Sequence, residues 1–104
     1  MPEVSAQPVV DPGEVDLVEV LRALSDRTRL AIVRELWTSP EKACGTFDVD
    51  VATSTLTHHF RILREAGIIA QRPEGTRKLT SLRVAALDAA YPGLLDSLFG
   101  RHER

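Results

Sequence analysis

Apolar and polar positions follow the period of an α-helix most clearly between residues 51 and 67. Leu56, Phe60 and Leu63 fall at i, i+4 and i+7, which is the apolar stripe of an amphipathic helix. Gly67 follows the stripe, at the position where many helices end in a left-handed residue. The pattern therefore predicts a helix that packs one face on the core and ends at Gly67.

The opposite face of this helix is polar and carries little negative charge. Ser54 or Thr53 can cap its start, because a short side-chain oxygen accepts from the free N–H groups of a first turn. Small hydroxyls near the start and arginines further along suit a helix in the DNA major groove. An ordinary solvated helix is the alternative. The residues predicted to read DNA are Ser54, Thr55, Thr57, His58 and Arg61.

The residues after the helix predict a β-hairpin. A β-favouring run at 68–70 and a Thr-rich segment at 76–83 flank the turn residues Pro-Glu-Gly. Arg72, Arg77 and Lys78 cluster at its tip, where they could contact the DNA backbone. A helix followed by a basic hairpin is typical of a winged helix-turn-helix, in which the hairpin reaches flanking phosphates or the minor groove.

The rest of the chain is mainly helical by pattern. A tail rich in proline is expected to be disordered over 1–13, a single domain occupies 14–100, and 101–104 is a frayed end. The fold class is therefore mainly α with a small β-hairpin (α+β), with about five helices and a two-stranded wing. Besides the helix above, helices are expected at 14–24, 26–37 after the cap Ser25, 41–47, 84–90 and 93–100.

Both ends of the domain carry more apolar side chains than one core can use. Between Val15 and Leu24 they occupy more than one helical stripe, and the last helix holds several within one short segment. Burying each one fully would stabilise by about 1.5–3 kcal/mol. We therefore expect a second subunit to cover them, through Val15, Val18, Leu21, Leu94, Leu95, Leu98 and Phe99.

Three segments together resemble the ArsR/SmtB family of small winged-helix repressors. They are LSDRTRLAIVREL (24–36), STLTHHFRILREAGII (54–69) and PEGTRKLTSL (73–82), in the order and spacing of the family. The resemblance implies a homodimeric bacterial transcriptional regulator, usually a repressor released by an inducer, with the first and last helices as the dimer interface. It also implies that His58 faces DNA and His59 packs beside the core. Residues 41–47 depart from the family, because Gly45 and Thr46 weaken a helix there.

The charge distribution supports a local DNA-binding surface on an acidic protein. The net charge is −2, which alone argues against nucleic acid. Residues 54–83, however, hold six Lys/Arg against two Asp/Glu, while residues 1–25 hold one against five. Screening confines each field to about 10 Å, so a local basic surface can still bind phosphates.

Metal, redox and catalytic chemistry find little support. Cys44 is the single cysteine, and no His lies near Asp88 or Asp96, so neither a thiolate site nor a site across the last helices is complete, and no metal or other cofactor is expected. A thiol-based redox switch through Cys44 remains a lesser alternative. No catalytic motif is present, so an enzyme is not expected.

The sequence also bears on location and on the main rival function. No signal peptide and no apolar run long enough for a membrane span are found, which predicts a cytoplasmic protein. The expected function is that of a homodimeric regulator on a pseudopalindromic operator, with double-stranded DNA and an unidentified inducer as partners. The rival is a winged-helix module that has lost DNA binding and uses the same surface for an acidic protein.

Overall fold

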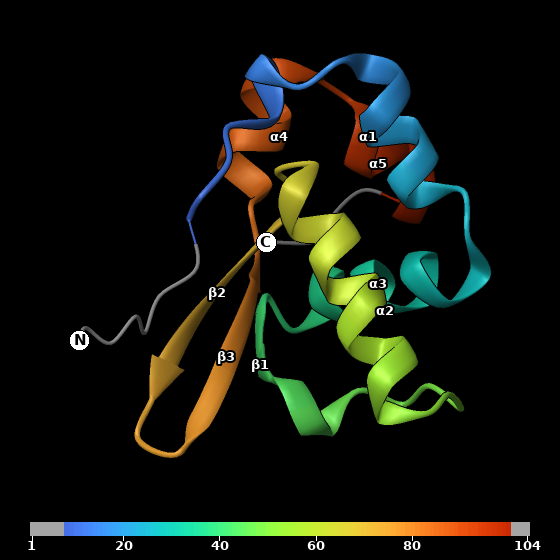
Figure 1. The fold of residues 1–104 in the computed structure, drawn as a ribbon. Helices are drawn as coiled ribbons and strands as arrows, with labels where there is room; N and C mark the ends of the chain where they lie inside the picture. The colour runs from blue at the N-terminus through green and yellow to red at the C-terminus, as the bar shows by residue number, and fades with distance from the viewer. Residues whose placement is uncertain (1–7, 101–104) are drawn as a thin grey trace.

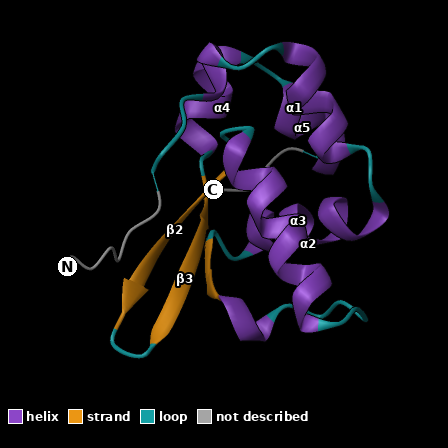
Figure 2. Cartoon of the chain, in the orientation of Figure 1, coloured by secondary structure: helices purple, strands orange, loops and turns teal. Residues whose placement is uncertain are grey.

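Helices pack along one side of a small antiparallel sheet (Figure 1; Figure 2) in the computed structural model, which describes residues 8–100. The predicted winged-helix α+β architecture is confirmed. Within that range the helices are α1 (Leu17–Leu24), α2 (Arg27–Thr38), α3 (Thr53–Glu65), α4 (Val84–Ala90) and α5 (Leu94–Phe99). The strands are β1 (Glu41–Ala43), β2 (Ile69–Glu74) and β3 (Arg77–Leu82), and short 3-10 helices cover Pro12–Glu14 and Cys44–Thr46. None of the described helices is long and apolar enough to cross a membrane.

The predicted hairpin is present and gains a third strand. β3 is central in the order β1-β3-β2, and both of its neighbours run antiparallel to it. Glu74 pairs with Arg77 across the turn, where Gly75 has a φ of +63°. Leu79 and Thr80 are buried, whereas Arg77 and Lys78 are exposed. The tip of the hairpin therefore projects beyond the core as a wing.

The start of α3 differs from the prediction, although the helix itself is confirmed. Thr53 and Ser54 both lie inside the helix, and the N-cap is Ala52, which makes no side-chain capping hydrogen bond. The predicted capping role of Ser54 or Thr53 is therefore wrong. Their hydroxyls remain available on the exposed surface.

The end of α3 follows the prediction closely. Ile68 N donates to Leu63 O at 3.0 Å and Gly67 N to Arg64 O at 3.0 Å, the hydrogen bonds of a helix that ends in a left-handed residue. Gly67 has a φ of +81°, and a Cβ atom there would lie 2.7 Å from the backbone nitrogen of Pro12. Both the conformation and the close approach require glycine.

Residues 41–47 do not form the predicted helix. They form β1 and then the 3-10 helix Cys44–Thr46, with Lys42 paired to Thr80 of β3. Gly45 and Thr46 favour a helix weakly, whereas the free edge of β3 supplies hydrogen-bonding partners. Lys42 Nζ also contacts Glu35 Oε1 at 2.6 Å. The strand therefore satisfies this segment better than a helix would.

The N-terminal segment is ordered earlier than predicted. Pro12 is buried, and Tyr91 Oη donates to Pro12 O at 3.4 Å and to Val15 O at 3.2 Å. The guanidinium of Arg83 donates to Val10 O. A disordered tail extending to residue 13 is therefore wrong for residues 10–13. The rest of that predicted tail before residue 8, and the predicted frayed end at 101–104, lie outside the described residues.

One hydrophobic core joins the helices to the base of the sheet. α5 is fixed on α2 by the ring of Phe99, whose centroid lies 6.1 Å from that of Trp37 and under the guanidinium of Arg34 at 5.8 Å. The largest fully buried apolar side chains come from α1 to α5, from the residue before β2 and from the first residue of β2: Val20, Ile32, Val33, Leu36, Leu63, Ile68, Ile69, Leu87 and Leu95.

Candidate nucleic-acid interface

The exposed face of α3 contains the side chains that the sequence assigned to DNA reading. The opposite face buries His59, Phe60 and Leu63, as the apolar stripe required. Glu65, the carboxylate of this helix, is its last residue. The exposed side chains are Ser54, Thr55, Thr57, His58 and Arg61, which together present hydroxyls, an imidazole and a guanidinium.

Two of these side chains are oriented by bonds within the helix. Arg61 Nη2 donates to His58 Nδ1 at 3.0 Å. A neutral imidazole that accepts at Nδ1 carries its hydrogen on Nε2, so His58 offers a donor there. Thr57 Oγ1 donates to Thr53 O at 3.0 Å, which leaves its lone pairs and methyl group to contact a partner. The face therefore presents a donor and an acceptor in fixed positions.

The first turn of α3 adds backbone donors to this surface. Ala52 provides no capping oxygen, and Leu56 N is the first amide of the helix to bond to it, through Ala52 O at 2.9 Å. Free N–H groups at a helix start, together with the helix dipole, favour an anion. Thr53, Ser54 and Thr55 are all exposed. A phosphate oxygen would be well placed there.

The three basic residues of the wing are not equivalent. Arg77 and Lys78 are exposed on β3, and no ion pair within residues 8–100 involves them. Arg72 instead contacts Glu74 at 2.8 Å and Glu41 at 3.3 Å. The hydrogen bond that Arg72 donates to Glu74, followed by the charge of Glu41, raises the pKa of Arg72 above its usual value. No carboxylate of the described residues therefore neutralises Arg77 or Lys78, whereas Arg72 joins β2 to β1.

A partly buried polar contact that the sequence did not predict holds α3 on α2. Arg29 Nη1 donates to His59 Nδ1 at 3.1 Å, and Arg29 Nε donates to Ala23 O at 2.7 Å. Asp26 Oδ2 accepts from Arg29 N at 3.0 Å and lies 3.9 Å from His59 Nδ1. Arg29 is half-buried, and these contacts engage its guanidinium. His59 packs beside the core, as expected from the family resemblance.

The residues predicted to form a dimer interface divide into two groups. The first group is exposed: Val18, Leu21 and Leu98 are 52%, 46% and 38% exposed. Leu17, which was not among the predicted interface residues, is also 46% exposed. Leu95 is 1% exposed in the single chain, so its predicted place at the interface is wrong; it belongs to the protomer core. The remaining three, Val15, Leu94 and Phe99, are partly buried against that core.

Cys44 lies half-buried beneath the wing, within a hydrogen-bonded group. Its Sγ is 3.2 Å from Thr80 Oγ1 and accepts from Gln71 Nε2 at 3.3 Å. Across residues 8–100 no three His, Cys, Asp or Glu side chains come together as a metal site would require. Asp88 and Asp96 are both exposed on α4 and α5.

Comparison with known proteins places the chain in a family. A family described as "Helix-turn-helix domain" matches residues 24–72. The HTH-type transcriptional regulator YceK of Bacillus subtilis, itself uncharacterized, is 39% identical over 83 residues, which are 77% of this chain and 83% of YceK. The chain belongs to the ArsR/SmtB-type winged helix-turn-helix transcriptional regulators. It is a DNA-binding protein of this family.

Two further relatives and one solved structure are also similar to this chain. The HTH-type transcriptional regulator Rv2034 of Mycobacterium tuberculosis is 36% identical over 65% of this chain and 64% of its own length. The cadmium resistance transcriptional regulatory protein CadC homolog of Staphylococcus aureus is 36% identical over 59% of this chain and 52% of its own length. The crystal structure of M. tuberculosis Rv0081 superimposes with a TM-score of 0.56 at 26% identity, over 79% of this chain and 88% of that one.

Proposed function

We propose that this regulator is a repressor that binds a pseudopalindromic operator as a homodimer. In this proposal α3 of each subunit enters the major groove of one half-site and the wing contacts the flanking backbone. The observation that carries it is the exposed face of α3, which combines hydroxyls, an imidazole and a guanidinium and places its carboxylate only at the last residue.

The hydrogen bonds within α3 assign different tasks to its side chains. With Nε2 as donor, His58 suits an acceptor such as guanine O6 or N7. Thr57 suits an amino group or a thymine methyl, because its own hydrogen is used within the helix. Ser54 and Thr55 lie beside the free N–H groups of the first turn and suit a phosphate or a base edge.

The wing and the apolar end of the protomer supply the remaining parts of the proposal. Arg77 and Lys78 would hold the backbone, with Arg72 contributing less because Glu41 and Glu74 occupy its guanidinium. The exposed apolar side chains of α1 and α5, Val18, Leu21 and Leu98, would bury against a second copy. Figure 1 shows α1 and α5 at one end of the molecule and the tip of the wing at the other.

The inducer of this repressor is not expected to be a metal ion. The CadC homolog is named for cadmium resistance, but this chain carries one cysteine, Cys44. One thiolate per subunit does not complete a tetrahedral site. Equilibrium dialysis with zinc, copper and arsenite should detect no tight stoichiometric binding, and stoichiometric binding that weakens DNA affinity would contradict this.

Selection of binding sites from a random duplex library tests the proposal. We expect the selected duplexes to share an inverted repeat with half-sites about one helical turn apart. Fluorescence anisotropy should then show tighter binding to the selected duplex than to a scrambled one at every salt concentration. Asp88→Asn, which changes an exposed charge of α4 that takes part in no ion pair found within residues 8–100, is a control that should bind like the original protein. Failure to enrich any sequence would favour the rival, a module that binds an acidic protein.

A further inference from the structure

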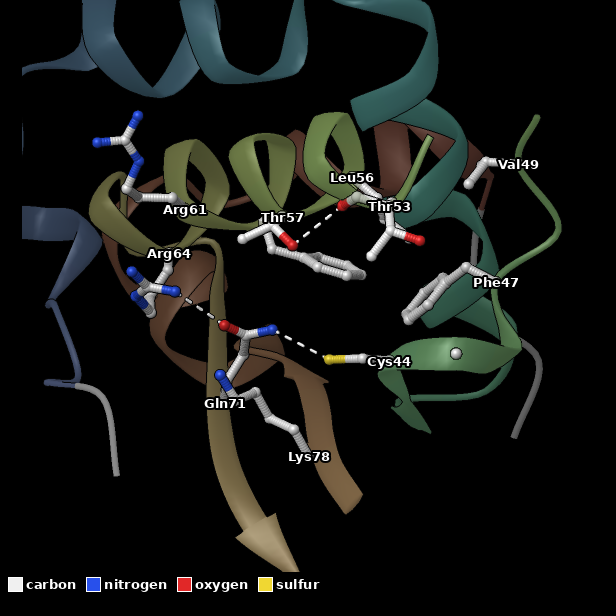
Figure 3. A pocket seen from close by; sticks show the side chains of 12 residues that line it. Cys44, Phe47, Val49, Thr53, Leu56, Thr57, Arg61, Arg64, Gln71 and Lys78 are labelled. Atoms are coloured by element: carbon white, nitrogen blue, oxygen red, sulfur yellow. Dashed lines mark hydrogen bonds between the residues drawn. The ribbon is translucent and has the colours of Figure 1, made fainter. Parts of the chain in front are cut away.

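A cavity of about 590 Å³ lies between α3, the wing and the segment that precedes α3 (Figure 3). That segment forms only the short 3-10 helix Cys44–Thr46, so it covers this side of α3 incompletely. The cavity is of the size that small-molecule sites usually have. Its lining includes Thr57 and Arg61, which belong to the proposed DNA-reading face.

The two ends of the cavity differ in chemistry. Phe47, Val49, Leu56 and Phe60 form an apolar end, where the rings of Phe47 and Phe60 meet edge to face with centroids 5.4 Å apart. Figure 3 shows Arg64, Gln71 and Lys78 at the opposite end, with the guanidinium of Arg61 turned away from them. The cavity therefore has one wall for a ring and one for a polar group.

The polar end carries positive charge without a balancing carboxylate. No Asp or Glu lines the cavity. Arg64 is half-buried, and Arg64 Nη1 donates to Gln71 Oε1, a neutral acceptor, at 2.8 Å. Gln71 is itself 4% exposed and is fixed by its bond to Thr80 Oγ1 at 3.1 Å. Ion pairs found among the described residues do not include Arg64 or Lys78. A half-buried cation held by a neutral partner favours an anionic ligand.

We propose that this cavity binds a small amphipathic anion, an aromatic carboxylate, as the effector of the regulator. Its ring would pack against the edge-to-face pair of Phe47 and Phe60, and its carboxylate would contact Arg64 and Lys78. Because Thr57 and Arg61 line the same cavity, a bound anion would weaken the attraction of this surface for DNA phosphates and compete with the operator. The predicted binding of the carboxylate rests on the cavity alone, whereas its competition with the operator rests on the proposed function.

The test compares two probes that differ in charge but hardly in shape, 2-naphthylacetate and 2-naphthylacetamide. Isothermal titration calorimetry on the full-length protein should show one acetate per chain, bound at least about tenfold more tightly than the amide, as a charge-assisted contact requires. Arg64→Gln keeps a donor for Gln71 but removes the charge, and should reduce this preference to less than about twofold. Arg64→Lys should retain the preference, and so should the matched control Arg27→Gln, which removes an exposed charge of α2 outside the cavity.

Several results would overturn the proposal. Equal binding of the acetate and the amide would show an apolar crevice with no anion site. Inorganic phosphate that binds as tightly as the acetate would show that Arg64 and Lys78 serve only as contacts for the DNA backbone. Absence of acetate binding at millimolar concentration would exclude an aromatic carboxylate site.

The regulatory half of the proposal has a separate readout. In anisotropy on the selected duplex, the acetate should release the original protein but not Arg64→Gln. A protein that binds the acetate but shows no specific DNA binding of its own would refute the proposed function instead, so the two failures are distinguishable.

Discussion

Helices α3 and α1 both leave one face exposed, and the two faces have opposite chemistry. On α3 the exposed side chains are hydroxyls, an imidazole and a guanidinium, whereas on α1 they include Leu17, Val18 and Leu21, which are 46–52% exposed. The opposite sides of both helices enter one core. Packing within the chain therefore accounts for one side of each helix and leaves the other side exposed to solvent.

The difference indicates which kind of partner each face is suited to. Water solvates the polar face of α3 well, so burying this face is not favourable in itself. It suits a polar partner such as DNA, with which it can form directional hydrogen bonds. Water does not solvate the face of α1 well, and covering it with another apolar surface is favourable at about 25 cal/mol per Å². We therefore assign DNA to α3 and a second copy of the chain to α1 and α5.

The largest expected effect comes from placing a charge on the face of α1. Leu21→Asp would bury a carboxylate without a partner at the proposed dimer interface, at a cost of about 3–5 kcal/mol. Sedimentation at micromolar concentration should give the 11.5 kDa monomer in place of a species of twice that mass. Ala85→Asp, which adds the same charge on the exposed surface of α4, should remain dimeric. A monomer before any mutation would contradict the assignment of α1.

The next effect separates two leucines of α5 that the sequence could not distinguish. Leu95→Ala should lower the free energy of unfolding by about 2–5 kcal/mol, because Leu95 is fully buried in the protomer. Leu98→Ala should instead weaken the dimer and leave the unfolding of the monomer almost unchanged. Urea denaturation at several protein concentrations measures both. The assignment fails if Leu98→Ala destabilises an isolated monomer as much as Leu95→Ala does.

Two variants of the proposed DNA-binding surface should affect different properties, namely sequence discrimination and overall affinity. His58→Ala should remove discrimination at one or two positions of each half-site, at about 1–3 kcal/mol. Arg77→Ala should weaken all sequences alike and reduce the salt slope by about one per subunit, because it removes a phosphate contact. Anisotropy on selected and scrambled duplexes at several salt concentrations measures both. If Arg77→Ala lost discrimination while His58→Ala kept it, the two roles would be reversed.

The smallest expected effect concerns the polar contact between α2 and α3. The hydrogen bond from Arg29 N, followed by the charge of Arg29, lowers the pKa of Asp26 below 3.8. A depressed folded-state pKa stabilises the protein above pH 3.8, and this contribution is lost as the pH falls through the folded-state value. Asp26→Asn, which keeps a capping oxygen, should cost less than about 1 kcal/mol at pH 7. The difference in unfolding free energy between the original protein and Asp26→Asn should narrow below about pH 4. A difference that does not change with pH would show that the charge of Asp26 contributes nothing.

Local pattern was sufficient to predict α3, α4 and the hairpin. Leu56, Phe60 and Leu63 define one helix face by spacing alone, and Gly67 and Gly75 mark the left-handed residues that end α3 and turn the hairpin. These features depend on neighbours close in the chain, where helical period and turn chemistry are informative. The polar face of α3 was predictable for the same reason.

Features that depend on distant partners were not predictable. Glu41–Ala43 becomes a strand because β3, which lies far along the chain, has a free edge. Arg72 has the same residue type as Arg77, yet only Arg72 meets Glu41 across the sheet. Leu95 and Leu98 are equally apolar, and the turn of α5 relative to the core decides which is buried. Such contacts cannot be inferred from the spacing of residues along the sequence.

The stoichiometry of the protein–DNA complex tests most directly whether α3 binds DNA and α1 binds a second copy. Native mass spectrometry with a selected duplex should show two 11.5 kDa chains per duplex, and Leu21→Asp should lose that complex while retaining weak binding of single chains. One chain per duplex in the original protein, or an unchanged two-chain complex with Leu21→Asp, would contradict the assignment of the two faces.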